Sequence, residues 1–70
     1  MKTLIGVFLM GTVDSIDNDS VRVELIDVEY RVTDRIVPLT TFPCYIVEGD
    51  MFYIEYSDNS AVLRCGEPPS

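Results

Sequence analysis

The stretch VRVELIDVEYRV, residues 21–32, alternates apolar and polar residues in two different phases. The apolar residues occupy odd positions up to Leu25 and even positions from Val28 onward. Because successive side chains of a strand point to opposite faces, this change of phase would turn the apolar set outward within one strand. The sequence therefore predicts a β-bulge or bend near Ile26–Asp27, at a barrel corner, with a tight hairpin at the same point as the alternative.

The segment before this stretch predicts a long first strand from Thr3 to Ile16. Its first half is apolar on both faces, so this part of the strand needs cover on both sides. The apolar run from Leu4 to Met10 lacks the cleavage site of a signal peptide and is too short to cross a bilayer. We therefore expect a strand and no membrane partner.

The segments after it predict short elements separated by turns. VPLTTFP, residues 37–43, reads as an edge segment or a one-turn helix, whereas MFYIEY (51–56) and AVLRC (61–65) read as strands. Apolar residues nowhere follow a convincing helical period. The sequence predicts an all-β fold, a small five-stranded SH3-like or OB-like barrel formed by residues 1–66, with a flexible tail at 67–70.

Composition limits the chemistry of the chain. The net charge of -7 disfavours direct nucleic-acid binding, and the absence of His excludes the usual zinc sites and His-based acid–base catalysis. Cys44 and Cys65 are expected to be reduced thiols in a cytoplasmic protein, although a disulfide is the alternative. Without a His to activate Cys44, nucleophilic catalysis is not expected.

The carboxylates form two further candidate sites. Asp14, Asp17 and Asp19 offer oxygen ligands near the first turn but lack the spacing of a calcium loop, so an ordinary Asx turn is expected. Glu29 and Glu55 make a carboxylate pair that nothing in the sequence places around a pocket. We therefore predict no catalytic residue, no metal, no cofactor and no enzymatic activity.

Three pieces of the sequence are GTVDSID (11–17), VPLTTFP (37–43) and EGDMFYIE (48–55). In this order they resemble the motifs V-D-x-I-E, V-P-L-x-x-L-P and E-G-D-V-L-x-x-E of a family of short, uncharacterised bacterial β-domains. That family has no established activity, so the resemblance implies a fold. More distantly, the chain is similar to the small OB-like hydrogenase-maturation chaperones, which depend on a cysteine directly after the initiator Met. Lys2 stands at that position here, so their chemistry is not implied.

The strand MFYIEY supplies the functional expectation. Alternation assigns Phe52, Ile54 and Tyr56 to the core, which leaves Met51 and Tyr53 on the other face. We expect a non-catalytic protein-binding or assembly module that binds a protein partner or forms a homo-oligomer through the first strand. The predicted interface consists of Ile5, Val7, Leu9, Met51 and Tyr53. The alternative is an acidic decoy, of the kind that phages encode, which occupies a basic nucleic-acid-binding groove of another protein.

Overall fold

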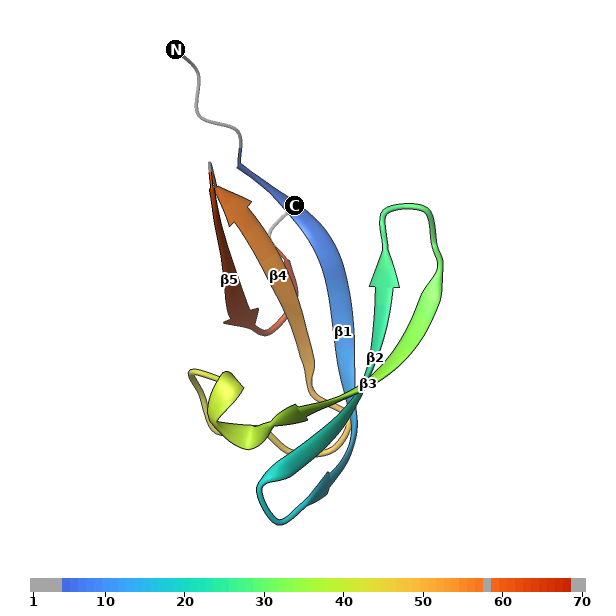
Figure 1. Ribbon diagram of the computed structural model, residues 1–70, viewed down its shortest axis with the longest axis vertical. Helices are drawn as coiled ribbons and strands as arrows, with labels where there is room; N and C mark the ends of the chain where they lie inside the picture. The colour runs from blue at the N-terminus through green and yellow to red at the C-terminus, as the bar shows by residue number, and fades with distance from the viewer. Residues whose placement is uncertain (1–4, 58, 69–70) are drawn as a thin grey trace.

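The structure, a computed structural model, describes residues 5–57 and 59–68, with side chains from Leu9 onward. Five antiparallel strands and one short 3-10 helix follow each other along the chain (Figure 1). The elements are β1 (Ile5–Asp17), β2 (Ser20–Asp27), β3 (Val32–Pro38), η1 (Leu39–Thr41), β4 (Met51–Ser57) and β5 (Ser60–Cys65). The prediction of an all-β fold with five strands is confirmed, and η1 lies where an edge segment or a one-turn helix was expected.

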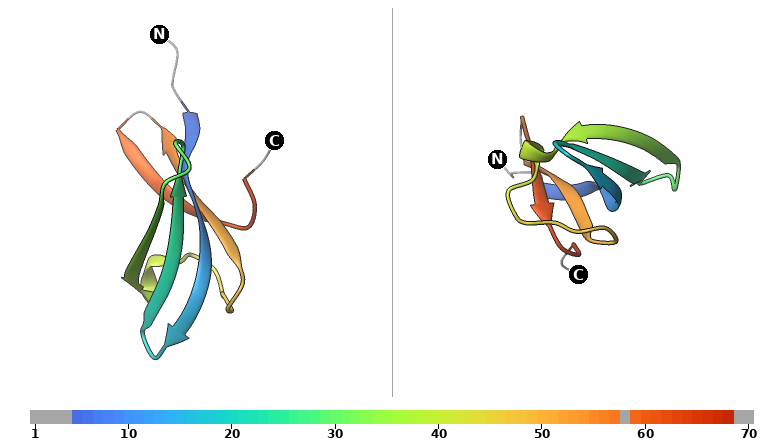
Figure 2. Two further views of the ribbon diagram at one scale, coloured as in Figure 1. Left: turned by 90° about the vertical axis from the view of Figure 1, so that its right-hand side faces the viewer. Right: turned by 90° about the horizontal axis from the view of Figure 1, so that it is seen from below.

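The strands form one sheet in the order β3-β2-β1-β4-β5. The sheet is strongly twisted, and the turn end of the β2–β3 hairpin stands apart from β4 and β5 (Figure 2). It does not close into a barrel, because β3 and β5 remain at opposite ends of the strand order. Instead of a further strand pairing, η1 and the loop that follows it lie across the open side at one end of the sheet (Figure 1).

The change of phase near Ile26–Asp27 is caused by a hairpin. Strand β2 ends at Asp27, β3 begins at Val32, and the pairing between them runs without a register shift from Ile26 and Val32 onward. The expected bulge is therefore replaced by its alternative, the tight hairpin. The bulges lie in β1 instead, where the register shifts between Val7 and Leu9 and between Val13 and Ser15.

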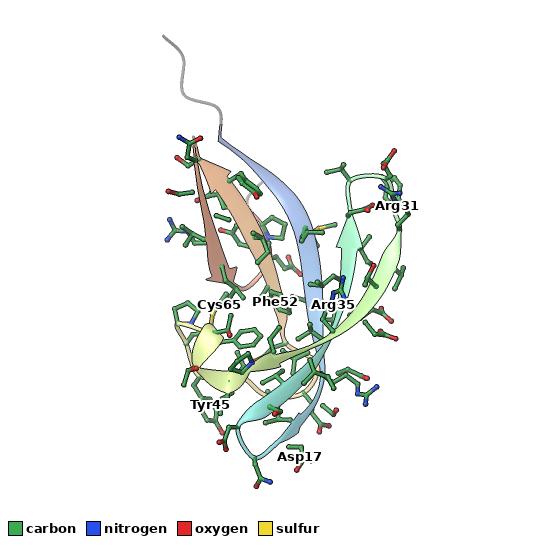
Figure 3. All side chains as sticks on the ribbon, in the orientation of Figure 1. Asp17, Arg31, Arg35, Tyr45, Phe52 and Cys65 are labelled. Carbon is green, nitrogen blue, oxygen red and sulfur yellow. A yellow bond between two sulfur atoms is a disulfide. The ribbon has the colours of Figure 1, made fainter. Side chains whose placement is uncertain are left out.

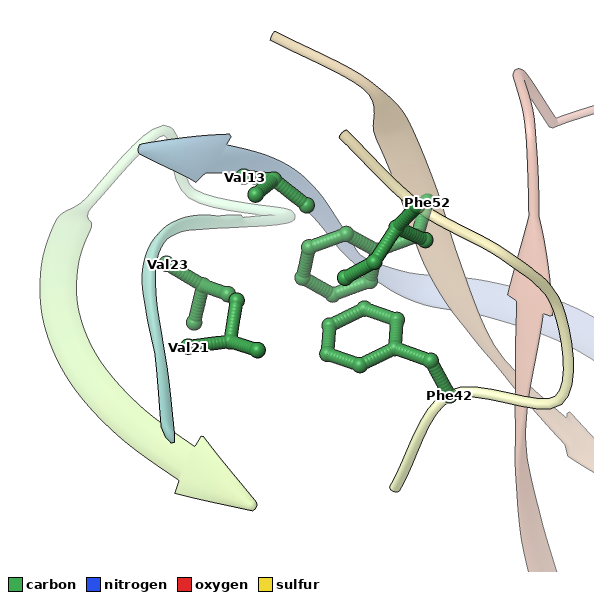
Figure 4. Close-up of a cluster of buried hydrophobic side chains, with 6 residues drawn as sticks. Val13, Val21, Val23, Phe42 and Phe52 are labelled. Carbon is green, nitrogen blue, oxygen red and sulfur yellow. The ribbon is translucent and has the colours of Figure 1, made fainter. Parts of the chain in front are cut away.

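The core lies where η1 and its loop cover the sheet. It consists of the buried side chains of Val13, Val21, Val23, Phe42, Ile46 and Phe52 (Figure 4). The rings of Phe42 and Phe52 meet edge to face, with 5.1 Å between their centroids, a favourable geometry for an aromatic pair. Gly11 makes room for this pair, because a Cβ atom there would lie 2.2 Å from the Phe52 ring.

Backbone hydrogen bonds and one disulfide fasten the covering loop. The N–H of Gly49 donates to the carbonyl of Val13, and the N–H of Val13 donates to the carbonyl of Asp50. Cys44 in the loop is bonded to Cys65 at the end of β5, with 6.6 Å between their Cα atoms. The expectation of two reduced thiols is therefore wrong. The pairing depends on the path of the loop to the sheet edge, which a sequence separation of 21 residues does not reveal.

The predicted start of the first strand and the absence of a membrane span can be compared with the structure only for the described residues. Thr3 and Leu4, the expected start of the first strand, lie outside them, and β1 begins at Ile5. Within residues 5–57 and 59–68, the structure contains no helix that is long and apolar enough to cross a membrane.

Candidate interaction surface

The loop between β2 and β3 is held by polar contacts of its own residues. The carboxylate of Asp27 accepts hydrogen bonds from the backbone N–H groups of Glu29, at 2.8 Å, and Arg31, at 3.0 Å. The guanidinium of Arg31 forms ion pairs with Asp27, at 3.1 Å, and with Glu29. These contacts fix the hairpin tip, by which we mean residues 27–32, although it is remote from the core.

The carboxyl group of Asp27 titrates below its ordinary range. Its pKa is lowered chiefly by the hydrogen bond from the backbone N–H of Arg31, and further by the N–H of Glu29 and the charge of Arg31. Each of these interactions favours the ionised form. The carboxylate is therefore the charged centre around which the hairpin tip is arranged.

Tyr30 occupies the most unusual backbone position of the tip. Its φ of +62° lies in the left-handed region, and 84% of its surface is exposed. Tyr30 ends a three-residue loop in which its own N–H donates to the carbonyl of Asp27, and glycine is the usual residue at this position. A bulky side chain there costs roughly 1–3 kcal/mol. The chain therefore holds an exposed aromatic side chain at an energetic cost.

Apolar side chains flank Tyr30 on the same hairpin. Val28 and Val32 are more than half exposed, as is Ile36 further along β3. Figure 3 shows the tip, marked by Arg31, at the opposite end of the molecule from Tyr45 and Asp17. The change of apolar phase after Leu25 was the sequence signal for this hairpin. It did not reveal that the even-numbered residues stay exposed, because that depends on which part of the sheet the η1 loop covers.

Of the five predicted interface residues, the structure describes the side chains of Leu9, Met51 and Tyr53. Leu9 stands opposite Ile54 in the register, whereas Tyr53 stands opposite Met10, so Leu9 and Tyr53 occupy opposite faces of the sheet. Tyr53 is buried, with 9% of its surface exposed, and Met51 is partly exposed. The side chains of the other two, Ile5 and Val7, lie outside the described part of the chain. This interface stays a prediction.

The remaining candidates form no catalytic group. Glu29 is paired with Arg31 at the hairpin tip, whereas Glu55 accepts a hydrogen bond from Arg64, at 3.3 Å, on the β4–β5 hairpin. Asp14, Asp17 and Asp19 are exposed around the first turn. In the part of the chain with described side chains, no three carboxylate, His or Cys groups are placed to hold a metal ion.

An apolar groove of about 390 Å³ lies beside the disulfide. Its lining includes Ile16, Leu39, Phe42, Cys44 and Tyr45. Because Cys44 is oxidised, the lining holds no thiolate nucleophile. The groove therefore offers apolar surface without a catalytic constellation.

Comparisons with known proteins add no relative. No family model, no curated protein and no solved structure matches the chain. The resemblances in motif order described above stay predictions, and a function has to be proposed from the geometry.

Proposed function

We propose that the chain is a non-catalytic protein-binding module whose recognition element is the hairpin tip. The observation that carries this proposal is Tyr30, an exposed aromatic residue in a left-handed backbone conformation. Glycine in its place would relieve the backbone strain, so folding alone does not account for the tyrosine. Backbone strain of this kind collects at functional sites, and tyrosine is enriched among the residues that dominate binding energy at protein interfaces.

The surroundings of Tyr30 support this role. The Asp27 and Arg31 contacts order the tip before binding, which reduces the entropy lost when a partner associates. Val28 and Val32 add exposed apolar surface beside the ring. Association through the first strand, predicted from the sequence, would have to use the faces of β1, because β2 and β4 both pair with it from Leu9 to Thr12.

The test compares two exposed tyrosines. Wild-type protein immobilised on beads is used to capture partners from a lysate of the source cells, and the captured protein is then purified and titrated. Tyr30→Gly removes the ring while relieving the strained backbone, and we expect it to weaken binding about tenfold or more. Tyr45→Ala is the matched control, because Tyr45 is 91% exposed and lies away from the tip. Equal binding by the wild type and Tyr30→Gly would contradict the proposal.

A second candidate function is the acidic decoy, and the distribution of carboxylates favours it. Among the described residues only Asp27, Glu29 and Glu55 form ion pairs. The carboxylates of Asp14, Asp17, Asp19, Glu24, Asp34, Glu48 and Glu67 form none there and are exposed. We propose that such a surface can occupy a basic groove of another protein.

The dependence of the dissociation constant on salt concentration distinguishes the two proposed functions. Binding by exposed charges weakens steeply as ionic strength rises, because salt screens them. Binding centred on Tyr30 and its apolar neighbours depends much less on salt. A dissociation constant for the captured partner that is nearly unchanged between 50 and 500 mM NaCl would contradict the decoy, and a steep rise would favour it over the hairpin tip.

A further inference from the structure

The two edges of the open sheet differ in how they are protected against pairing. Within the described residues, β3 pairs only with β2 and β5 pairs only with β4, so each has one free edge. Free strand edges present unpaired N–H and C=O groups that can template another strand. Proteins protect them with charged residues and proline. Strand β3 contains such residues, namely Asp34, Arg35 and Pro38. Strand β5 contains a single charged residue, Arg64, and no proline.

The hydrogen-bond pattern shows which residues of β5 face its free edge. The N–H of Gly66 donates to the carbonyl of Met51, in register with the β4–β5 pairs. Hydrogen-bonded and non-hydrogen-bonded pairs alternate along an antiparallel pair of strands, so the backbone of Val62 is hydrogen-bonded to Glu55 of β4. The residues on either side of it, Ala61 and Leu63, therefore direct their N–H and C=O groups toward the free edge.

A second copy of the same strand fits this edge. We propose that β5 pairs with β5 of a second copy of this chain about a two-fold axis at Val62. This register places Ala61 opposite the partner's Leu63 and Arg64 opposite the partner's Ser60, without like charges facing each other. Four inter-strand hydrogen bonds form, and the two sheets join into one of ten strands. Arg64 remains neutralised by Glu55 of its own chain.

Pairing of β3 with β3 of a second copy about a two-fold axis is less favourable. The bond from the N–H of Asp27 to the carbonyl of Arg31 sets the alternation there, so Val32, Asp34 and Ile36 face the free edge. A two-fold register centred on Asp34 places two aspartates opposite each other, and one centred on Arg35 places two arginines opposite each other. Directly opposed like charges destabilise strand pairs. These like-charge contacts favour the β5 edge over the β3 edge as the place where a second copy pairs.

The net charge of -7 on each copy predicts an unusual response to salt. Two acidic copies repel each other, and salt screens this repulsion. We therefore expect the dimer to become tighter as NaCl rises from 50 to 500 mM, which is opposite to the response of an acidic decoy bound to its partner.

The test uses Val62, which is 41% exposed and therefore tolerates substitution. In a non-hydrogen-bonded pair the opposed Cα atoms lie about 4.5 Å apart, within the range of a disulfide. In a glutathione buffer, Val62→Cys should form a covalent dimer through the two introduced thiols, as mapped by mass spectrometry. Ile36→Cys, on the β3 edge and outside the hairpin tip, is the matched control and should remain largely monomeric.

A second variant gives a readout without covalent chemistry. Val62→Lys places two ammonium groups opposite each other at the axis, and we expect a dissociation constant about tenfold higher in sedimentation equilibrium. Ile36→Lys, at an exposed position of β3 outside the hairpin tip, makes the same change of charge on the other edge and should leave the constant unchanged. A wild-type chain that stays monomeric at high micromolar concentration, or a dimer equally sensitive to both Lys variants, would overturn the proposal. Neither result bears on Tyr30, whose Gly variant should dimerise normally.

Discussion

The covered end of the sheet and the hairpin tip are held in place by different interactions. At the covered end, Val13, Val21 and Phe52 are buried under the η1 loop, and a disulfide holds that loop to β5. At the tip, Val28 and Tyr30 are exposed, and polar contacts around Asp27 provide the order. The comparison teaches that apolar residues with the same alternation form a core in one place and an exposed surface in another. Stability belongs to the first region, and we assign recognition to the second.

The largest expected effect is at the centre of the core. Phe52→Ala removes a ring that packs on Phe42 and over Gly11, and it should lower the free energy of unfolding by about 3–5 kcal/mol. A chain of this size is stable by roughly 4–10 kcal/mol, so the variant should be largely unfolded at moderate temperature. Urea denaturation followed by circular dichroism measures the change. The control Tyr45→Ala should alter the free energy by less than about 0.5 kcal/mol.

The next effect concerns the disulfide. Replacing both Cys44 and Cys65 with Ser opens a loop closed over a separation of 21 residues, which should lower the free energy of unfolding by about 3 kcal/mol. Amide exchange in the native state should accelerate for Phe42 and Ile46 and stay unchanged at the hairpin tip. Equal stability of the wild type and the double variant would mean that packing and backbone hydrogen bonds hold the loop without the disulfide.

A smaller effect of opposite sign is expected at the tip. Tyr30→Gly relieves the strain of a left-handed backbone and should raise the free energy of unfolding by about 1 kcal/mol, partly offset by the greater freedom of glycine in the unfolded chain. Gly49→Ala is the informative counterpart, because Gly49 also has a positive φ and a substitution there should destabilise the fold. Thermal unfolding of the two variants should shift in opposite directions. A lower melting temperature for Tyr30→Gly would show that the tyrosine stabilises the hairpin.

The smallest effect is the pH dependence of the tip. Because the pKa of Asp27 is lower in the folded chain than in the unfolded chain, its carboxylate contributes stability above the unfolded value, about 3.9. This contribution is lost as the pH falls through the lower, folded pKa. NMR titration should show the amide resonances of Glu29 and Arg31 moving together below pH 4. Asp27→Asn should abolish that shared transition, and its persistence in the variant would assign it to another carboxyl group.

The sequence predicted the strands better than the surfaces. Alternation placed Phe52 in the core correctly, and the two prolines of VPLTTFP indicated an edge segment or one-turn helix, where η1 lies. The disulfide could not be predicted, because it depends on contact between segments far apart in the chain, and the burial of Tyr53 could not be read from an alternation that placed it on the other face from Phe52. The exposure of Tyr30 could not be predicted for the same reason as the disulfide. The sequence contains the charged residues of β3 and the single charged residue of β5, but only the strand order shows that these two strands form the edges of the sheet.

The division of roles between the two ends is tested most directly by measuring Tyr30→Gly twice, once for stability and once for binding to the captured partner. We predict that the variant unfolds at a higher temperature than the wild type and binds about tenfold more weakly or worse. Such opposite signs would show that the tyrosine is kept for recognition at the expense of stability. A variant that gains stability and binds as tightly as the wild type would contradict the assignment of recognition to the hairpin tip.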